Sequence, residues 1–214
     1  MLRERLTITL EPDLVSAADA LVDRSAIRNR SHALEHLVKE GLGLHLLRQA
    51  FFFLGDGWGQ DQAERVAALC HTQGIVRSYL CASAGQESQR GDLRAVLGRR
   101  APEMASEDVP LDFGSGGAVL LRQAELEHPF LLVWLGADLR LPASLVGAYA
   151  AHRRLNHTVT QLIAGDGRRY AEAGLAIASP ALPGHIPAGI VSLQAAVFPE
   201  LLKTGTLGTY AFHV

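Results

Sequence analysis

Residues 5–10 of the sequence alternate strictly between polar and apolar side chains, and in residues 3–10 Arg3 extends the polar face. In an extended strand the apolar side chains share one face and the polar ones share the other. A single strand leaves its backbone N–H and C=O groups unpaired and needs a partner strand. No second segment of matching pattern follows nearby, so the source of this partner is the strongest constraint on the fold. The apolar face holds Leu6, Ile8 and Leu10, and the polar face holds Arg3, Arg5, Thr7 and Thr9.

Two short amphipathic helices are predicted after this strand. Pro12 and Asp13 are typical of a first helical turn, Asn29 or Ser31 can cap the second helix, and Gly41 or Gly43 can end it. The apolar positions at helical spacing are Leu14, Ala17, Ala18, Leu21 and Val22, then Leu34, Leu37, Val38 and Leu42. A strand and two helices in about 45 residues cannot enclose a core alone. We therefore expect a dimer, whose two strands pair antiparallel and whose four helices cover their apolar face.

Residues 1–45 resemble the ribbon-helix-helix DNA-binding fold of the MetJ/Arc/CopG class. The match rests on residues 5–10, Pro12, the Leu14/Leu21 helix, residues 29–31 and the apolar positions Leu34, Leu37 and Val38. The resemblance implies an intertwined homodimer, formed by a domain of residues 1–46, that places a two-stranded ribbon in the major groove of double-stranded DNA.

The outward face of the strand and the start of the second helix are the candidate DNA contacts. Arg5, Thr7 and Thr9 are expected to contact bases. Free amides and positive charge at a helix N-terminus suit phosphate binding, so Arg3, Arg28, Asn29, Arg30 and Ser31 are the expected phosphate contacts. One alternative stays open: the Arg/Thr face could be the solvated side of an ordinary sheet.

Composition sets further limits. A net charge of -2 in 214 residues does not by itself indicate nucleic-acid binding, so such binding must come from a local patch. Cys70 and Cys81 lie in apolar surroundings and are expected to be buried thiols. His32 and His36 stand four residues apart without an obvious third ligand, so no metal site and no cofactor are expected. With no signal peptide and no long apolar run, we expect a cytoplasmic, nucleoid-associated protein without membrane contact.

From residue 50 the sequence alternates short apolar strands with helical stretches, the pattern of an α/β domain. Strands are predicted at 50–54, 75–83, 130–135, 158–164, 175–179 and 206–214. Helices are predicted at 62–71, 91–97 and 143–153, and after the glycine-rich turn at 114–118 as far as residue 126.

Residues 50–214 resemble the sugar-nucleotide pyrophosphorylase (nucleotidyltransferase) fold, a doubly wound α/β sheet. Residues 111–121 are similar to that family's glycine-rich turn and helix beside the nucleoside base, and residues 130–138 to its strand ending in the metal-binding Asp. Residues 143–152, 175–180 and 197–202 are similar to later elements. The resemblance implies a crevice at the strand ends that takes a nucleotide-like molecule.

The same region departs from the family at the positions that carry its chemistry. The loop at 55–59 has no Arg, and it brings Asp56 and Asp61 near a place where phosphates would bind. The Lys-Pro segment is missing. We therefore expect a non-catalytic domain that senses an effector or oligomerises, with a pocket rimmed by Gly114, Ser115, Gly116, Gly117, Asp138 and Trp134. Alternatively, 114–117 is a plain tight turn and Asp138 a turn residue.

Together these features predict a sequence-specific transcription regulator, a repressor by default, that acts as a dimer or higher homo-oligomer. Two alternatives remain open. One is a sugar-nucleotide enzyme with a DNA anchor, and the other is an antitoxin whose first module binds DNA while the rest binds a toxin. The apolar content after residue 50 is that of a folded domain, whereas antitoxin tails are usually short and disordered.

Overall fold

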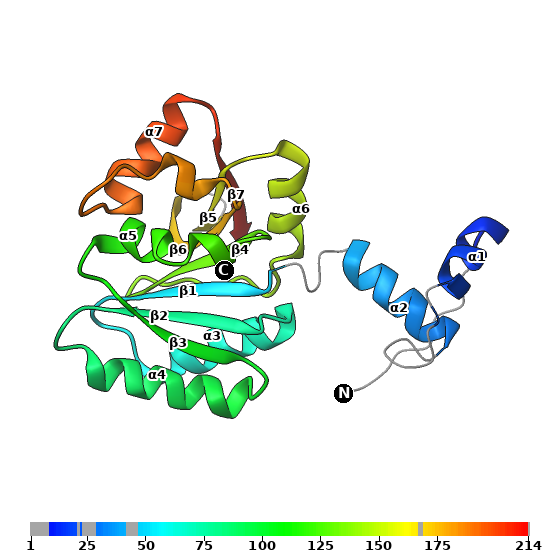
Figure 1. Ribbon diagram of the computed structural model, residues 1–214, viewed down its shortest axis with the longest axis horizontal. Coiled ribbons are helices and arrows are strands. Elements are labelled where there is room, and N and C mark those ends of the chain that lie inside the picture. The colour runs from blue at the N-terminus through cyan, green and yellow to red at the C-terminus, as the bar shows by residue number, and fades with distance from the viewer. Residues whose placement is uncertain (1–8, 21, 23–28, 42–46, 167–168, 214) are drawn as a thin grey trace. The chain divides into compact units, whose positions relative to one another are not determined.

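The computed structural model describes residues 9–20, 22, 29–41, 47–166 and 169–213. The chain divides into two compact units, residues 1–42 and 43–214 (Figure 1). Most of the strand predicted at 3–10 lies outside the described residues, as do Arg3, Arg5, Thr7 and Arg28. Thr9 and Leu10 are described and lie in neither helix nor strand.

The first unit contains the two helices expected from the sequence, α1 (Pro12–Ala20) and α2 (Arg30–Gly41). The carbonyl of Glu11 accepts hydrogen bonds from the amides of Leu14 and Val15, so α1 begins with Pro12 in its first turn. The carbonyl of Asn29 accepts from the amide of Ala33 at 3.0 Å. Of the two residues expected to cap α2, Asn29 is therefore the one that precedes its first turn.

The second unit is built around one sheet. Its strands are β1 (Gln49–Leu54), β2 (Arg77–Ala82), β3 (Ala105–Pro110), β4 (Phe130–Leu135), β5 (Val159–Gly165), β6 (Tyr170–Ala178) and β7 (Leu207–His213). Its α-helices are α3 (Gln60–Gln73), α4 (Glu87–Arg100), α5 (Gly114–Leu120), α6 (Val146–Leu155) and α7 (Phe198–Lys203). Short turns of helix, η1 (Gln123–Glu125), η2 (Leu182–His185) and η3 (Leu193–Val197), complete it.

The seven strands form one mixed sheet in the order β3-β2-β1-β4-β6-β5-β7. The first four strands in this order run parallel to one another. β6 runs antiparallel to both of its neighbours, and β7 pairs parallel with β5. The chain thus moves outward from β1 to β3, crosses back to β4 and then builds the other half of the sheet. The α/β class predicted from the sequence is confirmed at this level.

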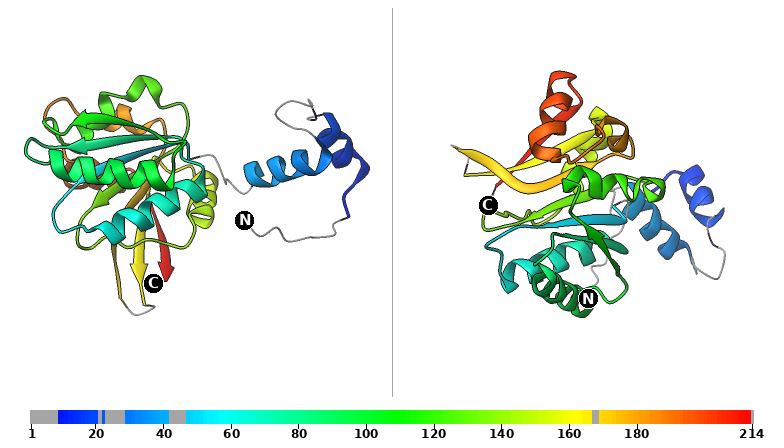
Figure 2. Two further views of the ribbon diagram at one scale, coloured as in Figure 1. Left: turned by 90° about the horizontal axis from the view of Figure 1, so that it is seen from below. Right: turned by 60° about the vertical axis from the view of Figure 1, so that its left-hand side comes forward.

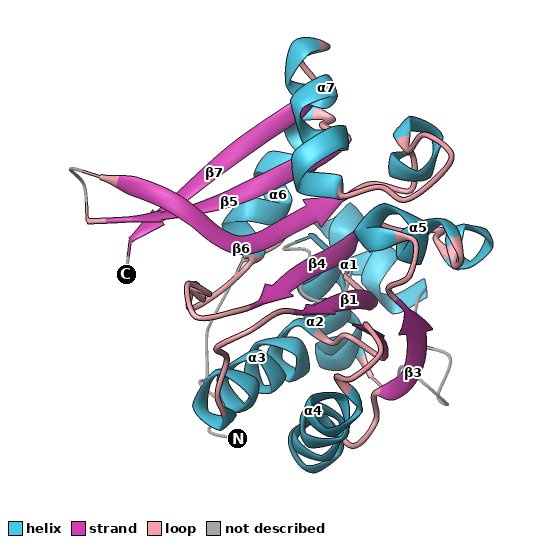
Figure 3. Cartoon of the chain, turned by 90° about the vertical axis from the view of Figure 1, so that its left-hand side faces the viewer, coloured by secondary structure: helices cyan, strands magenta, loops and turns pink. Residues whose placement is uncertain are grey.

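Alternate residues of the central strands pack into two separate cores. Phe52 of β1 and Val133 of β4 belong to the core under α3, α4 and α6. Phe51 and Leu132, their neighbours in the chain, belong to the core under α5, η2, η3 and α7. Helices therefore cover both faces of the sheet, with α3 and α4 on one side and α5 on the other (Figure 3). A strand buried on both faces reads as a continuous apolar run, as the sequence shows at 50–54.

The edge strand β3 was not predicted from the sequence because it contains a run of polar residues. Its acidic side chains form ion pairs with arginines outside the strand. Glu107 pairs with Arg122 at an N–O distance of 3.2 Å, and Asp108 pairs with Arg90 at 3.5 Å. Only Val109 of this strand is buried. Charged side chains on an edge strand disfavour edge-to-edge pairing with other molecules, and they also remove the apolar alternation by which a strand is recognised.

β6 begins at Tyr170, five residues before the predicted start. Its first part pairs with β5 alone, since β4 pairs with β6 only from Leu175 onward. This part of the hairpin extends beyond β4, whereas β7 pairs with β5 as far as Gly165 (Figure 2).

Both cysteines of the chain belong to the second unit. Cys70 and Cys81 are free and buried, as predicted, and burial raises the pKa of the Cys70 thiol to about 12. None of the helices that the structure describes is long and apolar enough to cross a bilayer.

Candidate functional site

The strand order reverses between β1 and β4, because the chain builds outward from β1 on one side and resumes at β4 on the other. In open α/β sheets, ligands bind outside the carboxyl ends of the strands at such a switch point. The loops that follow these two strands, residues 55–59 and 136–140, are therefore the expected location of a ligand site.

These two loops are in direct contact. The amide of Gly55 donates to the carbonyl of Leu135 at 2.8 Å. Gly57 has a φ of +76°, which favours glycine, and a Cβ there would lie 3.2 Å from the Cβ of Ala137. Ala137 therefore packs against the first loop. The next residue, Asp138, lines a pocket beside this contact.

A pocket of about 630 Å³ opens at this place. Its walls come from the two loops, from the end of β4, from β5 and β6, and from η3. Three of its lining residues are acidic and one is basic. The lining residues are Asp56, Trp134, Leu135, Gly136, Ala137, Asp138, Leu139, Arg140, Ala164, Ala171, Glu172, Gly174 and Gln194. The volume is within the range of small-molecule sites.

The charged side chains of this pocket are uncompensated. In the described part of the chain, Asp56, Asp138 and Glu172 form no ion pair, and Arg140 binds only the carbonyl of Leu139. Three carboxylates against one guanidinium make a negative potential that opposes a triphosphate. No group of three or more His, Cys, Asp or Glu side chains among the described residues is placed to hold a metal ion.

Trp134 supplies the aromatic wall of the pocket. Its ring stacks at a tilt on Phe53, with centroids 5.3 Å apart, and meets Phe198 edge-on at 5.8 Å. These contacts hold the indole in place. Trp134 and Asp138 are the two residues of the predicted rim that line the pocket.

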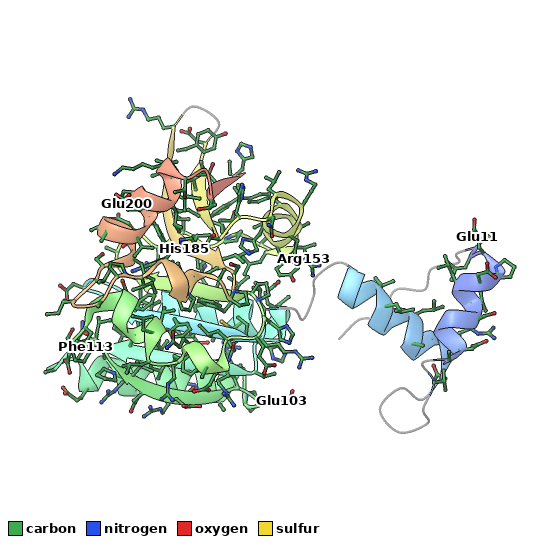
Figure 4. The ribbon with its side chains drawn as sticks, turned by 45° about the horizontal axis from the view of Figure 1, so that its top comes forward. Glu11, Glu103, Phe113, Arg153, His185 and Glu200 are labelled. Atoms are coloured by element: carbon green, nitrogen blue, oxygen red, sulfur yellow. The ribbon has the colours of Figure 1, made fainter. Side chains whose placement is uncertain are left out.

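The glycines of the predicted rim do not line this pocket. They lie at the start of α5 and pack against the segment before η3 instead. A Cβ on Gly114 would lie 2.5 Å from the carbonyl oxygen of Val191, and one on Gly116 would lie 3.1 Å from the same atom. Glycine is therefore needed at these positions for close backbone packing. Phe113, just before them, reaches the surface (Figure 4).

The polar groups of this turn are also engaged within the protein. The amide of Gly116 donates to the carbonyl of Val191 at 2.8 Å, and the hydroxyl of Ser115 accepts from the amide of Leu193 at 2.9 Å. These bonds tie the turn before α5 to the segment around η3, and they occupy the amide of Gly116 and the hydroxyl of Ser115.

In the first unit, the structure places four of the eight expected DNA contacts. Thr9, Asn29, Arg30 and Ser31 are all exposed. The guanidinium of Arg30 donates two hydrogen bonds to the carboxylate of Asp19, at 2.6 and 2.5 Å. This pairing lowers the pKa of the Asp19 carboxyl. Both side chains remain about half exposed, so a phosphate could reach Arg30.

Sequence reasoning missed Arg140, Glu172 and Gln194 as pocket residues. Glu172 lies in the part of β6 that was not predicted as strand, and Gln194 lies on the short η3 turn. Arg140 immediately follows the predicted strand-end loop, and its spacing from Asp138 could have identified it.

Comparison with known protein families finds no family model that matches this chain, and a search of curated proteins finds no match either. The candidate sites therefore rest on their own geometry.

Proposed function

We propose that this protein is a sequence-specific DNA-binding regulator, a repressor by default, that acts as a homodimer or higher homo-oligomer through residues 1–46. The observation that carries the proposal is the pair of helices α1 and α2 with apolar side chains left at the surface. Leu14, Leu37 and Val38 are 55%, 37% and 52% exposed. Apolar side chains at helical spacing on two consecutive helices are what a second copy would cover.

The alternating sequence at residues 3–10 is the source of the base contacts in this proposal. In a ribbon-helix-helix dimer this segment would pair with its copy, and Arg5, Thr7 and Thr9 would contact bases in the major groove. Arg3, Arg28, Asn29, Arg30 and Ser31 would contact phosphates and set the register. A strand that takes its partner from a second chain has no partner within one chain.

We further propose that the second unit is a non-catalytic relative of the nucleotidyltransferases that binds an effector or oligomerises. The pocket beside Asp138 supports an effector site because of its volume and its place at the switch point. Its excess of carboxylates argues against transfer of a nucleotidyl group, which needs cationic groups around the phosphates. A nucleotide-like effector would have to present little negative charge to Asp56, Asp138 and Glu172.

The test is selection of DNA fragments from random sequence by the full chain, followed by binding measurements on the selected site at defined salt. Arg5→Ala should abolish selectivity while leaving the protein folded, because it removes base contacts and no core. Arg48→Ala removes one exposed positive charge from the second unit and is the matched control. A protein that selects no sequence, or an Arg5→Ala variant with unchanged selectivity, would contradict the proposal.

A further inference from the structure

A second hollow lies on the opposite side of the first switch-point loop, between the start of α3 and one face of α4. Its volume is about 320 Å³, within the range of small-molecule sites. It is lined by Trp58, Gly59, Gln60, Ala63, Gln89, Asp92, Ala95, Val96 and Arg99. We call it the α3–α4 groove. It shares no residue with the pocket beside Asp138.

Two polar atoms of the groove's own side chains lack the hydrogen bonds that they need. The indole Nε1–H of Trp58 and the amide Oε1 of Gln89 are shielded from solvent, and neither has a partner in the described part of the chain. Leaving such a group unpaired is costly. Both side chains are only partly buried, so each can turn its polar atom toward the groove. One atom is a donor and the other an acceptor, and a ligand must therefore offer both kinds of group.

The donors gather on the α3 side of the groove. Trp58 and Gly59 precede α3, and Gly59 provides no side-chain cap for the amides of the first turn. A Cβ on Gly59 would meet nothing within 4 Å, so the space before this 14-residue helix is open. The amides of Gln62 and Ala63 already donate to the carbonyl of Gly59, so Gln60 and Asp61 supply the remaining first-turn amides. Together with an indole N–H, these amides suit a carboxylate. Asp61, the acid of this first turn, does not line the groove.

The acceptors lie on the α4 side. Gln89 and Asp92 are three residues apart and so share one face of this helix. No ion pair of Asp92 is formed with the described residues. A carboxylate beside a free amide oxygen suits an ammonium group. Arg99, at the far end of the same face, is already bound to Glu64 at 3.3 Å.

Between these polar walls the groove is lined by small apolar side chains. Ala63 and Val96 are buried, and Ala95 lies beside Val96 on α4. A short apolar side chain of a ligand would cover this part and exclude water from it.

From this arrangement we propose that the α3–α4 groove binds a free α-amino acid with an apolar side chain. Its carboxylate meets Trp58 Nε1–H and the first amides of α3. Its ammonium meets Gln89 Oε1 and Asp92, and its side chain lies on Ala63, Ala95 and Val96. This site is independent of the proposed DNA contacts and of the pocket beside Asp138.

The experiment is calorimetric titration of the full chain with L-leucine and with its two halves. One half is 4-methylpentanoate, which lacks the ammonium, and the other is isopentylamine, which lacks the carboxylate. Leucine should bind saturably with one site per chain, and each half should bind at least about tenfold more weakly. Absence of leucine binding up to its solubility limit, or equal binding of either half, would overturn the proposal.

Three variants locate the site. Trp58→Phe keeps the ring but removes the N–H, Gln89→Leu removes the acceptor, and Asp92→Asn removes the charge. Each should weaken leucine binding by about tenfold. The matched controls, Tyr170→Phe, Gln123→Leu and Glu103→Gln, change exposed residues that line neither the groove nor the pocket beside Asp138, and they should leave leucine binding unchanged. Unchanged binding in all three groove variants would place the site elsewhere and refute the assignment. Because Asp92 is exposed, Asp92→Asn keeps the test decisive if a Trp58 variant does not fold.

Discussion

The two units of this chain differ in how they bury apolar side chains. In the second unit, Phe51, Phe52 and Leu132 are fully buried between the sheet and its covering helices. In the described part of the first unit, the fully buried side chains are those of Ala18 and Ala33, and Leu14 is more than half exposed. A sheet covered on both faces closes its own core, whereas two short helices do not. The described residues of the first unit therefore bury too little to form a core of their own, whereas the second unit has a core on each face of its sheet.

The largest expected effect is a loss of stability caused by a substitution at the centre of the sheet. Phe52→Ala should lower the free energy of unfolding by about 3–5 kcal/mol, because it removes a fully buried aromatic ring and leaves a cavity. Urea unfolding followed by circular dichroism measures the change. Leu14→Ala, at a position of α1 that is 55% exposed within one chain, is the comparison. It should lower the free energy of unfolding of the second unit much less, because Leu14 lies in the first unit. Equal losses in the two variants would mean that the two units do not differ as described.

The second effect is a dependence of stability on pH that arises from a buried histidine of the second unit. His152 of α6 is 3% exposed, and its Nδ1 lies 3.0 Å from the hydroxyl of Thr160. Burial, and then the charges of His157 and Arg153, lower the pKa of His152 from 6.5 to about 4. The unfolded chain therefore takes up this proton at a higher pH than the folded chain does.

It follows that the stabilisation is complete above pH 6.5 and is lost as the pH falls toward 4, by up to about 3 kcal/mol. Urea unfolding at a series of pH values measures the slope. His152→Gln should flatten the slope in this range, and replacing the exposed His185 by Gln should not. A slope that is the same in wild type and His152→Gln would assign the pH dependence to other groups.

The third effect concerns the exposed apolar face of the first unit. Leu37→Asp should weaken self-association by about tenfold or more, because a charge at this position would have to be buried by the second copy. Analytical ultracentrifugation measures the dissociation constant. Leu202→Asp, at a 63% exposed position of α7, is the matched control and should leave association unchanged. If the control dissociates the protein and Leu37→Asp does not, the interface lies in the second unit.

The smallest effect tests whether Asp19 competes with DNA for Arg30. Asp19→Asn should free the guanidinium for a phosphate and steepen the dependence of log affinity on log salt by about 1. The measurement is titration of the selected DNA at several salt concentrations. Asp13→Asn, in the first turn of α1, is the control for the lost negative charge. Identical slopes for the two variants would show that Arg30 does not contact DNA.

Sequence patterns predicted the buried strands well because burial on both faces requires continuous apolar residues. β4 spans the predicted residues 130–135, and β1 differs from its prediction by one residue. The polar edge strand β3 was missed because its stability comes from arginines on other elements, which no local pattern reveals. The early part of β6 was missed for a related reason, since residues 170–172 pair with β5 but are exposed.

The candidate pocket was predicted only in part. Asp138 and Trp134 follow directly from the end of a recognisable strand, and both line the pocket. Glu172 and Gln194 come from segments 34 or more residues later in the chain and meet the pocket through folding alone. The glycines at 114–117 looked like part of a ligand loop, but Gly114 and Gly116 pack against Val191 and Gly117 packs against Phe113. A glycine needed for close packing and one needed for a ligand leave the same pattern in a sequence.

The sequence by itself determined the α/β class, the two helices before the sheet and the buried cysteines, because each depends on local periodicity or on apolar surroundings near in the chain. The tertiary structure alone decided the strand order, the acidic lining of the pocket and the pairing of Arg30 with Asp19. It also brought Trp58 and Gln89 to one groove. These features join residues that are distant in sequence, and their contacts exist only once the chain has closed around its core.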